Sequence, residues 1–287
     1  MNTSPTSLKR AKHPARKCVF CGNGKLSEEH IWSQWSRDLL PSSDGYREVT
    51  HKNRGGKPVD YRLVRDAQGP ITNKRLKRVC KPCNSVWMGK QEEKVKAVVT
   101  ELIAGNAFCL TNLKRATLVS WIVTKLMVLD VFRDGEQAFT AEERAAFYSD
   151  WTVPSSLSVW LLRCGDGAWK TSFWSHAQRL TVVVGDTWEN ARPPTGAGPN
   201  LKLFLWGVGE ALIVAAYARE LDLDLGMQDE FAIQLVPDQR IERAWPPRSI
   251  TAGEALSLQL TLPSLASGLG ANQIELGDDG EPVGKAQ

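Results

Sequence analysis

The sequence predicts an α+β protein: an N-terminal module fastened by zinc, then a helical region, then a mostly antiparallel, β-rich C-terminal domain. Two Cys-x-x-Cys pairs in the first third indicate the zinc module. Apolar residues with helical spacing follow up to about residue 150, and short β-rich runs come after Pro154. The expected segments are a flexible basic arm at 1–17, the zinc module at 18–105 with an inserted loop at about 41–72, an α+β domain of unassigned role at 106–265 and a flexible tail at 266–287.

The composition is typical of a folded protein without a membrane span. The 287 residues are 42% hydrophobic and 24% charged, which excludes wholesale disorder, collagen-like and coiled-coil structures. Lys125 interrupts the most apolar stretch, so no run approaches the roughly 18 residues of a membrane-spanning helix. The first 17 residues lack the apolar core and cleavage site of a secretory signal. We therefore expect a cytoplasmic protein.

Positive charge is concentrated in the first third of the chain. Residues 1–100 contain 21 Lys and Arg against 9 Asp and Glu, whereas residues 101–287 contain 15 against 23. A basic module joined to an acidic one is typical of a protein that meets a polyanion through one part only. The asymmetry favours nucleic acid as the partner, and a solvated lysine-rich surface is the alternative.

Three helices are predicted between residues 90 and 150. Apolar residues at i, i+3, i+4, i+7 and i+8 predict a helix over 90–105 that ends at Gly105. The segment 113–132 is apolar nearly all round, which predicts a buried helix. The sequence from Thr140 to Glu143 is a capping box, which predicts a short helix to about Asp150.

Short runs rich in β-branched and aromatic residues predict the strands of the C-terminal domain. Turn-forming residues separate these runs, as in an antiparallel sheet. The predicted strands are 158–164, 170–176, 180–184, 201–206, 211–217, 231–236 and 257–262.

Four of the six cysteines form the two pairs, Cys18-x-x-Cys21 and Cys80-x-x-Cys83. Thiols stay reduced in a chain without an export signal, and two such pairs are typical of a closed, structural Zn²⁺ site. Each pair makes a tight turn that points both thiolates at one ion, and metal binding then helps the module to fold. The other two cysteines, Cys109 and Cys164, stand alone in apolar surroundings, so we expect both to be buried thiols.

Polar residues of types that take part in catalysis flank the cysteine pairs. Glu29 and His30 follow the first pair, and Asn84 comes directly after Cys83. A carboxylate, an imidazole and a carboxamide are therefore expected close to one zinc-fastened scaffold. The densest group of cations lies around the second pair, as expected for side chains that neutralise nucleic-acid phosphates; it comprises Lys74, Arg75, Lys77, Arg78 and Lys81.

Together these residues resemble the zinc-bearing, four-cysteine branch of the HNH, or ββα-metal, endonucleases. That branch has the same order of first cysteine pair, acidic residue plus His, second cysteine pair, and an Asn or His directly after it. The pair Trp87-Met88, followed by Glu92, also resembles bacterial and prophage members. The resemblance covers about residues 18–105 and implies an N-terminal ββα finger that presents His30 from a strand and Asn84 from the first turn of a helix.

The resemblance also implies roles for these residues. Glu29 and Asn84 would hold a catalytic Mg²⁺ or Mn²⁺, and His30 would be the general base that activates water. Asn73 is the best match to a further orienting residue, and Arg78 would contact phosphate. Hydrolysis of DNA would leave a 5′ phosphate, in a role such as phage defence or mobile-element biology.

Other interpretations of the same residues stay open at this point. Asn84 could instead cap the helix that follows it. The chain could be a zinc ribbon that binds DNA without cutting it, or a nuclease or toxin directed at RNA. If it cuts both strands of DNA, a homodimer is expected, because a finger holds one active site.

Overall fold

The computed structural model describes residues 16–50, 62–132, 137–165, 167–183, 191–196, 198–221, 223, 225–237, 242–268 and 273–275. Most of the predicted basic arm and most of the predicted tail lie outside these residues. The short strand β15 (Gln273–Glu275) lies within the predicted tail and pairs with β8 (Leu180–Val183). Within the described residues, no helix is long and apolar enough to cross a membrane.

The N-terminal third contains an antiparallel pair of strands followed by a helix. Strand β1 (Leu26–His30) pairs with β4 (Arg75–Cys80), and the chain continues through a π-helical turn, η3 (Cys83–Met88), into helix α1 (Gly89–Ala104). The segment between the strands holds the short helices η1 (Gln34–Leu39) and η2 (Ile71–Asn73) and a hairpin of β2 (Gly45–Thr50) and β3 (Arg62–Gln68). His30 therefore ends a strand, and Asn84 lies in the turn that leads into a helix.

The helices predicted between residues 90 and 150 are confirmed. Helix α1 ends at Gly105, whose φ of 71° is a left-handed conformation that glycine adopts readily. Helix α2 (Asn112–Asp130) is buried along most of its length. Helix α3 (Ala141–Asp150) begins with the predicted capping box, in which Thr140 and Glu143 exchange side-chain to backbone hydrogen bonds.

The C-terminal part is built on one main sheet with the strand order β12-β6-β11-β10-β7. These neighbours are all antiparallel, and the short β14 (Ser249–Ile250) adds to β6 in parallel. The main strands are β6 (Leu157–Cys164), β7 (Phe173–Gln178), β10 (Leu201–Val208), β11 (Ala211–Ala218) and β12 (Ala232–Val236). The smaller elements are β5 (Phe108–Leu110) paired with β13 (Arg243–Trp245), β9 (Ala191–Arg192) paired with β8, and η4 (Gly167–Trp169).

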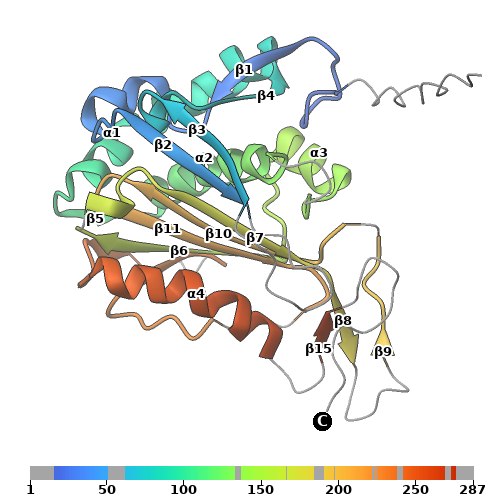
Figure 1. Ribbon diagram of the computed structural model, residues 1–287. Helices are drawn as coiled ribbons and strands as arrows, with labels where there is room; N and C mark the ends of the chain where they lie inside the picture. Colours follow the sequence, from blue (N-terminus) through green and yellow to red (C-terminus); the bar gives the residue numbers. More distant parts are fainter. Residues whose placement is uncertain are drawn as a thin grey trace, which may run out of the picture.

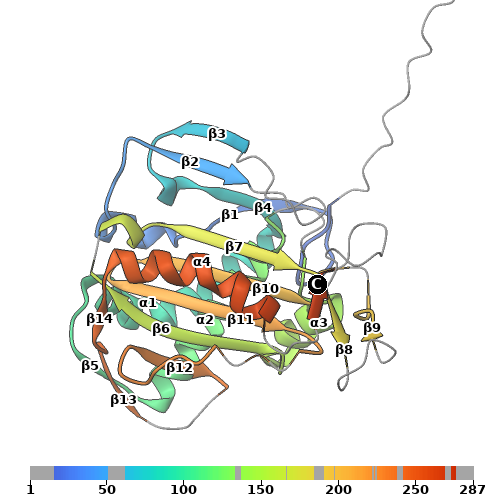
Figure 2. The ribbon, with the colours of Figure 1, turned by 60° about the horizontal axis from the view of Figure 1, so that its bottom comes forward.

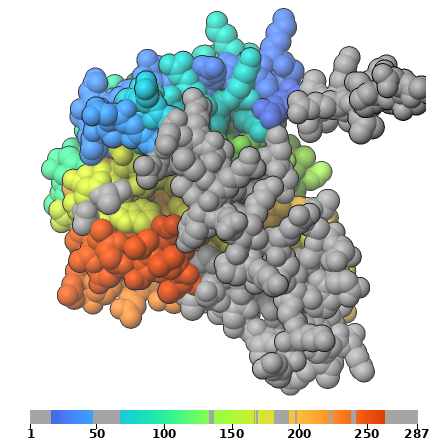
Figure 3. All heavy atoms as spheres, in the orientation of Figure 1, coloured from blue at the N-terminus to red at the C-terminus, as the bar shows by residue number. Residues whose placement is uncertain are grey.

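The sheet lies between two layers. Helices α1 to α3 and the N-terminal strands cover one face, and α4 (Ala252–Gly268) covers the other (Figures 1 and 2). Every residue of β10 and β11 is buried, and their side chains divide between two apolar clusters: Phe204 and Trp206 face the first, Leu203 and Leu205 the second. The space-filling view shows the N-terminal third, in blue to cyan, on the side opposite α4 (Figure 3).

A direct contact fastens the N-terminal third to the sheet. The Trp32 side chain is 1% exposed, and its Nε1 donates a hydrogen bond of 2.9 Å to the carbonyl oxygen of Gly207 in β10. Gly207 has to be glycine, since a Cβ there would lie 1.5 Å from the carbonyl oxygen of Trp169. One continuous apolar cluster therefore runs from Cys18 to Trp245.

Two predictions of the sequence analysis are wrong. Residues 257–262 are part of helix α4 rather than a strand, because Thr251 and Glu254 cap the start of a helix through reciprocal hydrogen bonds of 2.7 and 3.2 Å. Cys109 is exposed on the edge strand β5, where its Sγ lies 3.8 Å from a carboxylate oxygen of Glu242. Cys164 is buried, as predicted.

Candidate metal centre and active site

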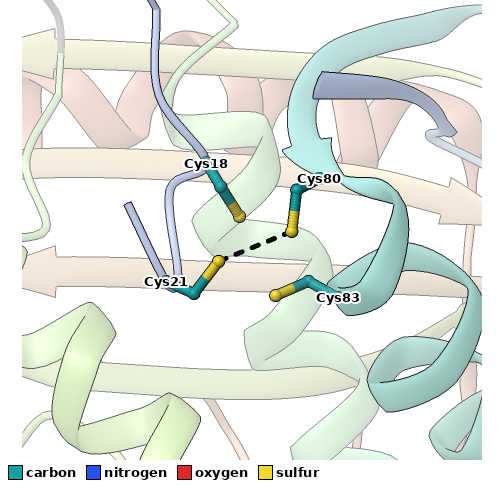
Figure 4. A group of neighbouring side chains, drawn as sticks. All are labelled: Cys18, Cys21, Cys80 and Cys83. Carbon is teal, nitrogen blue, oxygen red and sulfur yellow. Dashed lines mark hydrogen bonds between the residues drawn. The ribbon is translucent and has the colours of Figure 1, made fainter. Parts of the chain in front are cut away.

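The two cysteine pairs meet at one point. Figure 4 shows the side chains of Cys18, Cys21, Cys80 and Cys83 converging on a common centre. Their sulfur atoms all lie within 4.8 Å of one another, and Cys21 Sγ is 3.4 Å from Cys80 Sγ. A tetrahedral Zn²⁺ with Zn–S bonds of about 2.3 Å holds its sulfurs ~3.8 Å apart, so the cluster fits a metal ion such as zinc. No other group of three or more His, Cys, Asp or Glu side chains in the described ranges could hold a metal.

The backbone around the first pair explains this convergence. Gly22 has a φ of 72° and donates its N–H to the carbonyl oxygen of Cys18 at 2.9 Å, which closes a tight turn. Burial raises the pKa of the Cys83 thiol, and the neighbouring Cys80 and Cys21 thiols raise it further. A bound cation is what would allow these crowded thiols to ionise together.

Aromatic residues from α3 pack against the cysteine cluster. Trp87, which follows the second pair, stacks on Trp151 with ring centroids 4.9 Å apart and planes at 15°. Trp87 also contacts Phe20 at 4.9 Å and Tyr148 at 5.0 Å. The Cys83 thiol raises the pKa of Tyr148, so this residue of α3 lies close to the cysteine cluster.

The strand pair β1–β4 carries His30, and Asn84 is hydrogen-bonded to β1. His30 lies opposite Arg75 in the register of the two strands. Asn84 Nδ2 donates to Ser27 Oγ at 3.2 Å and to the carbonyl oxygen of Glu28 at 3.0 Å. The carboxamide is therefore fixed against β1, and its carbonyl Oδ1 lies outside these two bonds.

His30 lies half-buried in a positively charged environment. Burial lowers its pKa to about 4, and the cations of Arg37, Arg75 and Lys125 act in the same direction. The imidazole is therefore neutral at pH 7 and able to accept a proton. Its Nε2 is buried and has no hydrogen-bond partner among the described residues.

Glu29 lies on the side of β1 opposite to its neighbour His30 and forms an ion pair with a buried lysine. The carboxylate is 5% exposed and accepts a hydrogen bond from Lys125 Nζ on α2. The same Nζ donates to the carbonyl oxygen of His30 at 3.0 Å and pairs with Glu92 Oε1 at 2.9 Å. Burial raises the pKa of Glu29 despite the Lys125 charge. Glu29 and Asn84 thus form different contacts in this structure and do not make one ligand pair.

The predicted cation cluster is divided by the strand that carries it. Arg75 and Lys77 are exposed on β4, and Arg75 pairs with Glu28 at 3.0 Å. Arg78 is 8% exposed and lies on the buried side. Lys74 is half-buried, with its Nζ 5.0 Å from the centroid of the Phe132 ring.

The remaining two predicted residues lie at the margins of the strand pair. Lys81 is exposed between the second pair of cysteines. Asn73 is exposed at the end of η2, and the described residues give its side chain no hydrogen bond to the site. The orienting role predicted for Asn73 therefore has no contact to support it here.

The structure adds basic residues that the sequence analysis did not select. Arg16 and Lys25 join Lys77 around an open hollow beside the start of β1. Arg37, on η1, is the cation with the largest effect on His30. Three exposed cations therefore surround the hollow beside the start of β1, and Arg37 adds positive charge near His30.

Lys125 and Glu92 were also not selected as site residues, although each had a signal in the sequence. A single lysine in the middle of an apolar helix requires a buried partner. Glu92 stands near the start of α1 and its predicted buried face. Neither signal could identify Glu29 as the partner, because 96 residues separate it from Lys125.

No protein-family model, curated protein or solved structure matches this chain.

Proposed function

We propose that this protein is a metal-dependent, HNH-type endonuclease that hydrolyses phosphodiester bonds of DNA, with His30 as general base. The observation that carries the proposal is the half-buried His30 at the end of β1, opposite Arg75, on the strand whose Glu28 carbonyl oxygen accepts a hydrogen bond from Asn84. The strand pair and the following helix have the ββα order that the family resemblance implies, and the cysteine cluster joins their ends.

In the proposed reaction, a water molecule gives its proton to the His30 imidazole while its oxygen bonds to phosphorus. The bond from phosphorus to the 3′ oxygen breaks, and that oxygen takes a proton from solvent. The products are a 5′ phosphate and a 3′ hydroxyl. Arg75 and Lys77 would neutralise neighbouring phosphates of the bound strand.

The expected Mg²⁺ or Mn²⁺ site fits the residues only in part. The Asn84 carbonyl Oδ1 suits such a cation, which prefers oxygen ligands and would supply charge neutralisation at the phosphate. The Glu29 carboxylate does not fit, because it is buried against Lys125. His30 and the basic strand face therefore carry the proposed chemistry, and the cation requirement is left to the assay.

A zinc-ribbon protein that binds DNA without cutting it is the second candidate. The pairing of Glu29 with Lys125 favours it, because the Glu29 carboxylate is then not offered to a catalytic cation. An RNA-directed nuclease is the third, and it shares the same site. One assay, with DNA and RNA substrates and a His30 variant, distinguishes these two candidates from the DNA endonuclease.

The test is cleavage of supercoiled plasmid, single-stranded DNA and RNA with Mg²⁺, Mn²⁺ or EDTA. We expect cation-dependent cleavage of DNA that falls by roughly 10²–10⁴-fold in His30→Ala. His176→Ala is the matched control, because that half-buried histidine stacks on Trp174 in β7 instead. Binding without cleavage by the folded, zinc-loaded wild type would favour the ribbon, and cleavage unchanged in His30→Ala would remove His30 from the mechanism.

A further inference from the structure

Lys125 is a fully buried cation in the centre of helix α2. Its side chain is 2% exposed, and apolar residues surround it along the helix. A buried ammonium persists only where acceptors replace its lost water. The acceptors that contact the ammonium therefore indicate which parts of the structure Lys125 holds together.

All three N–H groups of the Lys125 ammonium have an acceptor within reach. They are Glu29 Oε1, Glu92 Oε1 at 2.9 Å and the carbonyl oxygen of His30 at 3.0 Å. Glu92 Oε1 also accepts from Ser33 Oγ at 2.5 Å. The cluster thus joins three elements: β1 and the residues just after it, α1 and α2.

The third acceptor distinguishes this cluster from a general structural ion pair. By bonding to the main-chain oxygen of His30, Lys125 fixes the backbone of the residue proposed as the base. Glu29 is next to His30 on the same strand, and its bond to the same ammonium fixes that strand a second time. A displacement of Lys125 would therefore shift the main chain that carries the imidazole.

We propose that Lys125 is a positioning residue for His30, and that Glu29 serves as the anchor of Lys125 rather than as a ligand of a catalytic cation. This inference rests on the proposed function for its effect on catalysis. Its structural content, the coupling of α2 to the His30 backbone, can be measured independently of activity.

The first experiment uses Glu29→Gln, which keeps a hydrogen-bond acceptor and leaves Lys125 paired with Glu92. If Glu29 is an anchor, the Glu29→Gln variant should have a kcat no more than about 3-fold below that of the wild type. The Mg²⁺ concentration for half-maximal cleavage should stay unchanged. A cation ligand should instead require at least a 10- to 100-fold higher Mg²⁺ concentration after the same change. An increase of 10-fold or more would overturn the proposal.

The second experiment uses Lys125→Met, which removes the ammonium and keeps most of the volume. We expect kcat to fall by 10-fold or more with KM nearly unchanged, and the His30 Cε1–H resonance to shift in ¹H–¹³C NMR spectra. Because two carboxylates then lose their counter-charge, the double variant Glu29→Gln/Lys125→Met is measured beside it. Lys125→Arg tests whether restoring a cation restores the His30 signal.

The outcomes separate this inference from the proposed function. If the wild type cleaves no nucleic acid, the proposed function fails, but the His30 resonance still reports whether Lys125 positions the ring. If Lys125→Met and the double variant are folded and leave both kcat and the His30 resonance unchanged, Lys125 is not a positioning residue and the proposal fails.

Discussion

Removal of the metal is predicted to open the N-terminal third while the main sheet stays folded. The cluster joins two turns with 58 residues between them in the sequence. By the loop-closure argument for a cross-link, closing a loop of this length contributes about 4 kcal/mol. Binding of structural Zn²⁺ stabilises small finger peptides by about 10–16 kcal/mol at pH 7, which is the upper limit of the stabilisation expected here. Even the lower figure corresponds to roughly a 10³-fold loss of amide protection.

Hydrogen exchange with mass spectrometry measures this effect before and after chelation. Peptides covering β1, β4 and η3 should lose protection, whereas those covering β10 and β11 should keep it, because both faces of these strands are buried. Cys83→Ser should behave like the chelated protein, and Cys109→Ser is the matched control, since that thiol is exposed and outside the cluster. Metal-free protein with unchanged protection of β1 and β4 would refute the reasoning.

Four further predictions concern His30, Asp130 and the basic face. Because the His30 pKa is about 4, below the usual 6.5, its neutral form persists to lower pH; kcat/KM should hold to about pH 5, whereas an acid limb near 6.5 would contradict this. The unfolded chain binds a proton at His30 at higher pH than the folded chain does, so His30 contributes stability that is lost as pH falls from 6.5 towards 4. Thermal melts over this pH range should therefore show a smaller loss of Tm in His30→Gln than in the wild type. Asp130 is 0% exposed and pairs with Arg144 and Lys202. Asp130→Asn should therefore lower the free energy of unfolding by about 3–5 kcal/mol and lower Tm by roughly 10 °C in a thermal-shift assay. The double change Arg75→Ala/Lys77→Ala should reduce the slope of log K against log salt by about 2 in DNA-binding titrations, and an unchanged slope would exclude these side chains from phosphate contact.

Periodicity and caps predicted helices α1 to α3 and the strands β6, β7, β8, β10, β11 and β12. The strand predicted at 257–262 is wrong for a physical reason. Residues 257–262 alternate leucine with polar residues, which is the pattern of a half-buried strand. The chain forms a helix there because Thr251 and Glu254, six and three residues before the alternation, satisfy the first free backbone N–H groups of α4. A local start signal thus prevailed over a short periodic one.

The cation cluster shows how far sequence proximity can predict a surface. Five cations lie within eight residues and were predicted to act together, but a strand sends alternate side chains to opposite faces. Arg75 and Lys77 are therefore exposed while Arg78 is buried. Arg16 and Lys25 join Lys77 around the hollow. They are 61 and 52 residues before Lys77 in the chain, so they could be found only in the folded molecule.

Glu29 illustrates why a motif identifies a site more readily than it assigns the roles within it. Its spacing from the cysteines places it correctly on β1, beside His30. Which way its carboxylate points depends on α2, whose lysine lies 96 residues further along the chain. The same helix carries Trp121, packed on Trp206 of β10, so the position of Lys125 is set by the sheet beneath it. The main sheet, by locating α2, thus sets the backbone of the residue proposed as the base, which gives the C-terminal part a place in the chemistry of the N-terminal third.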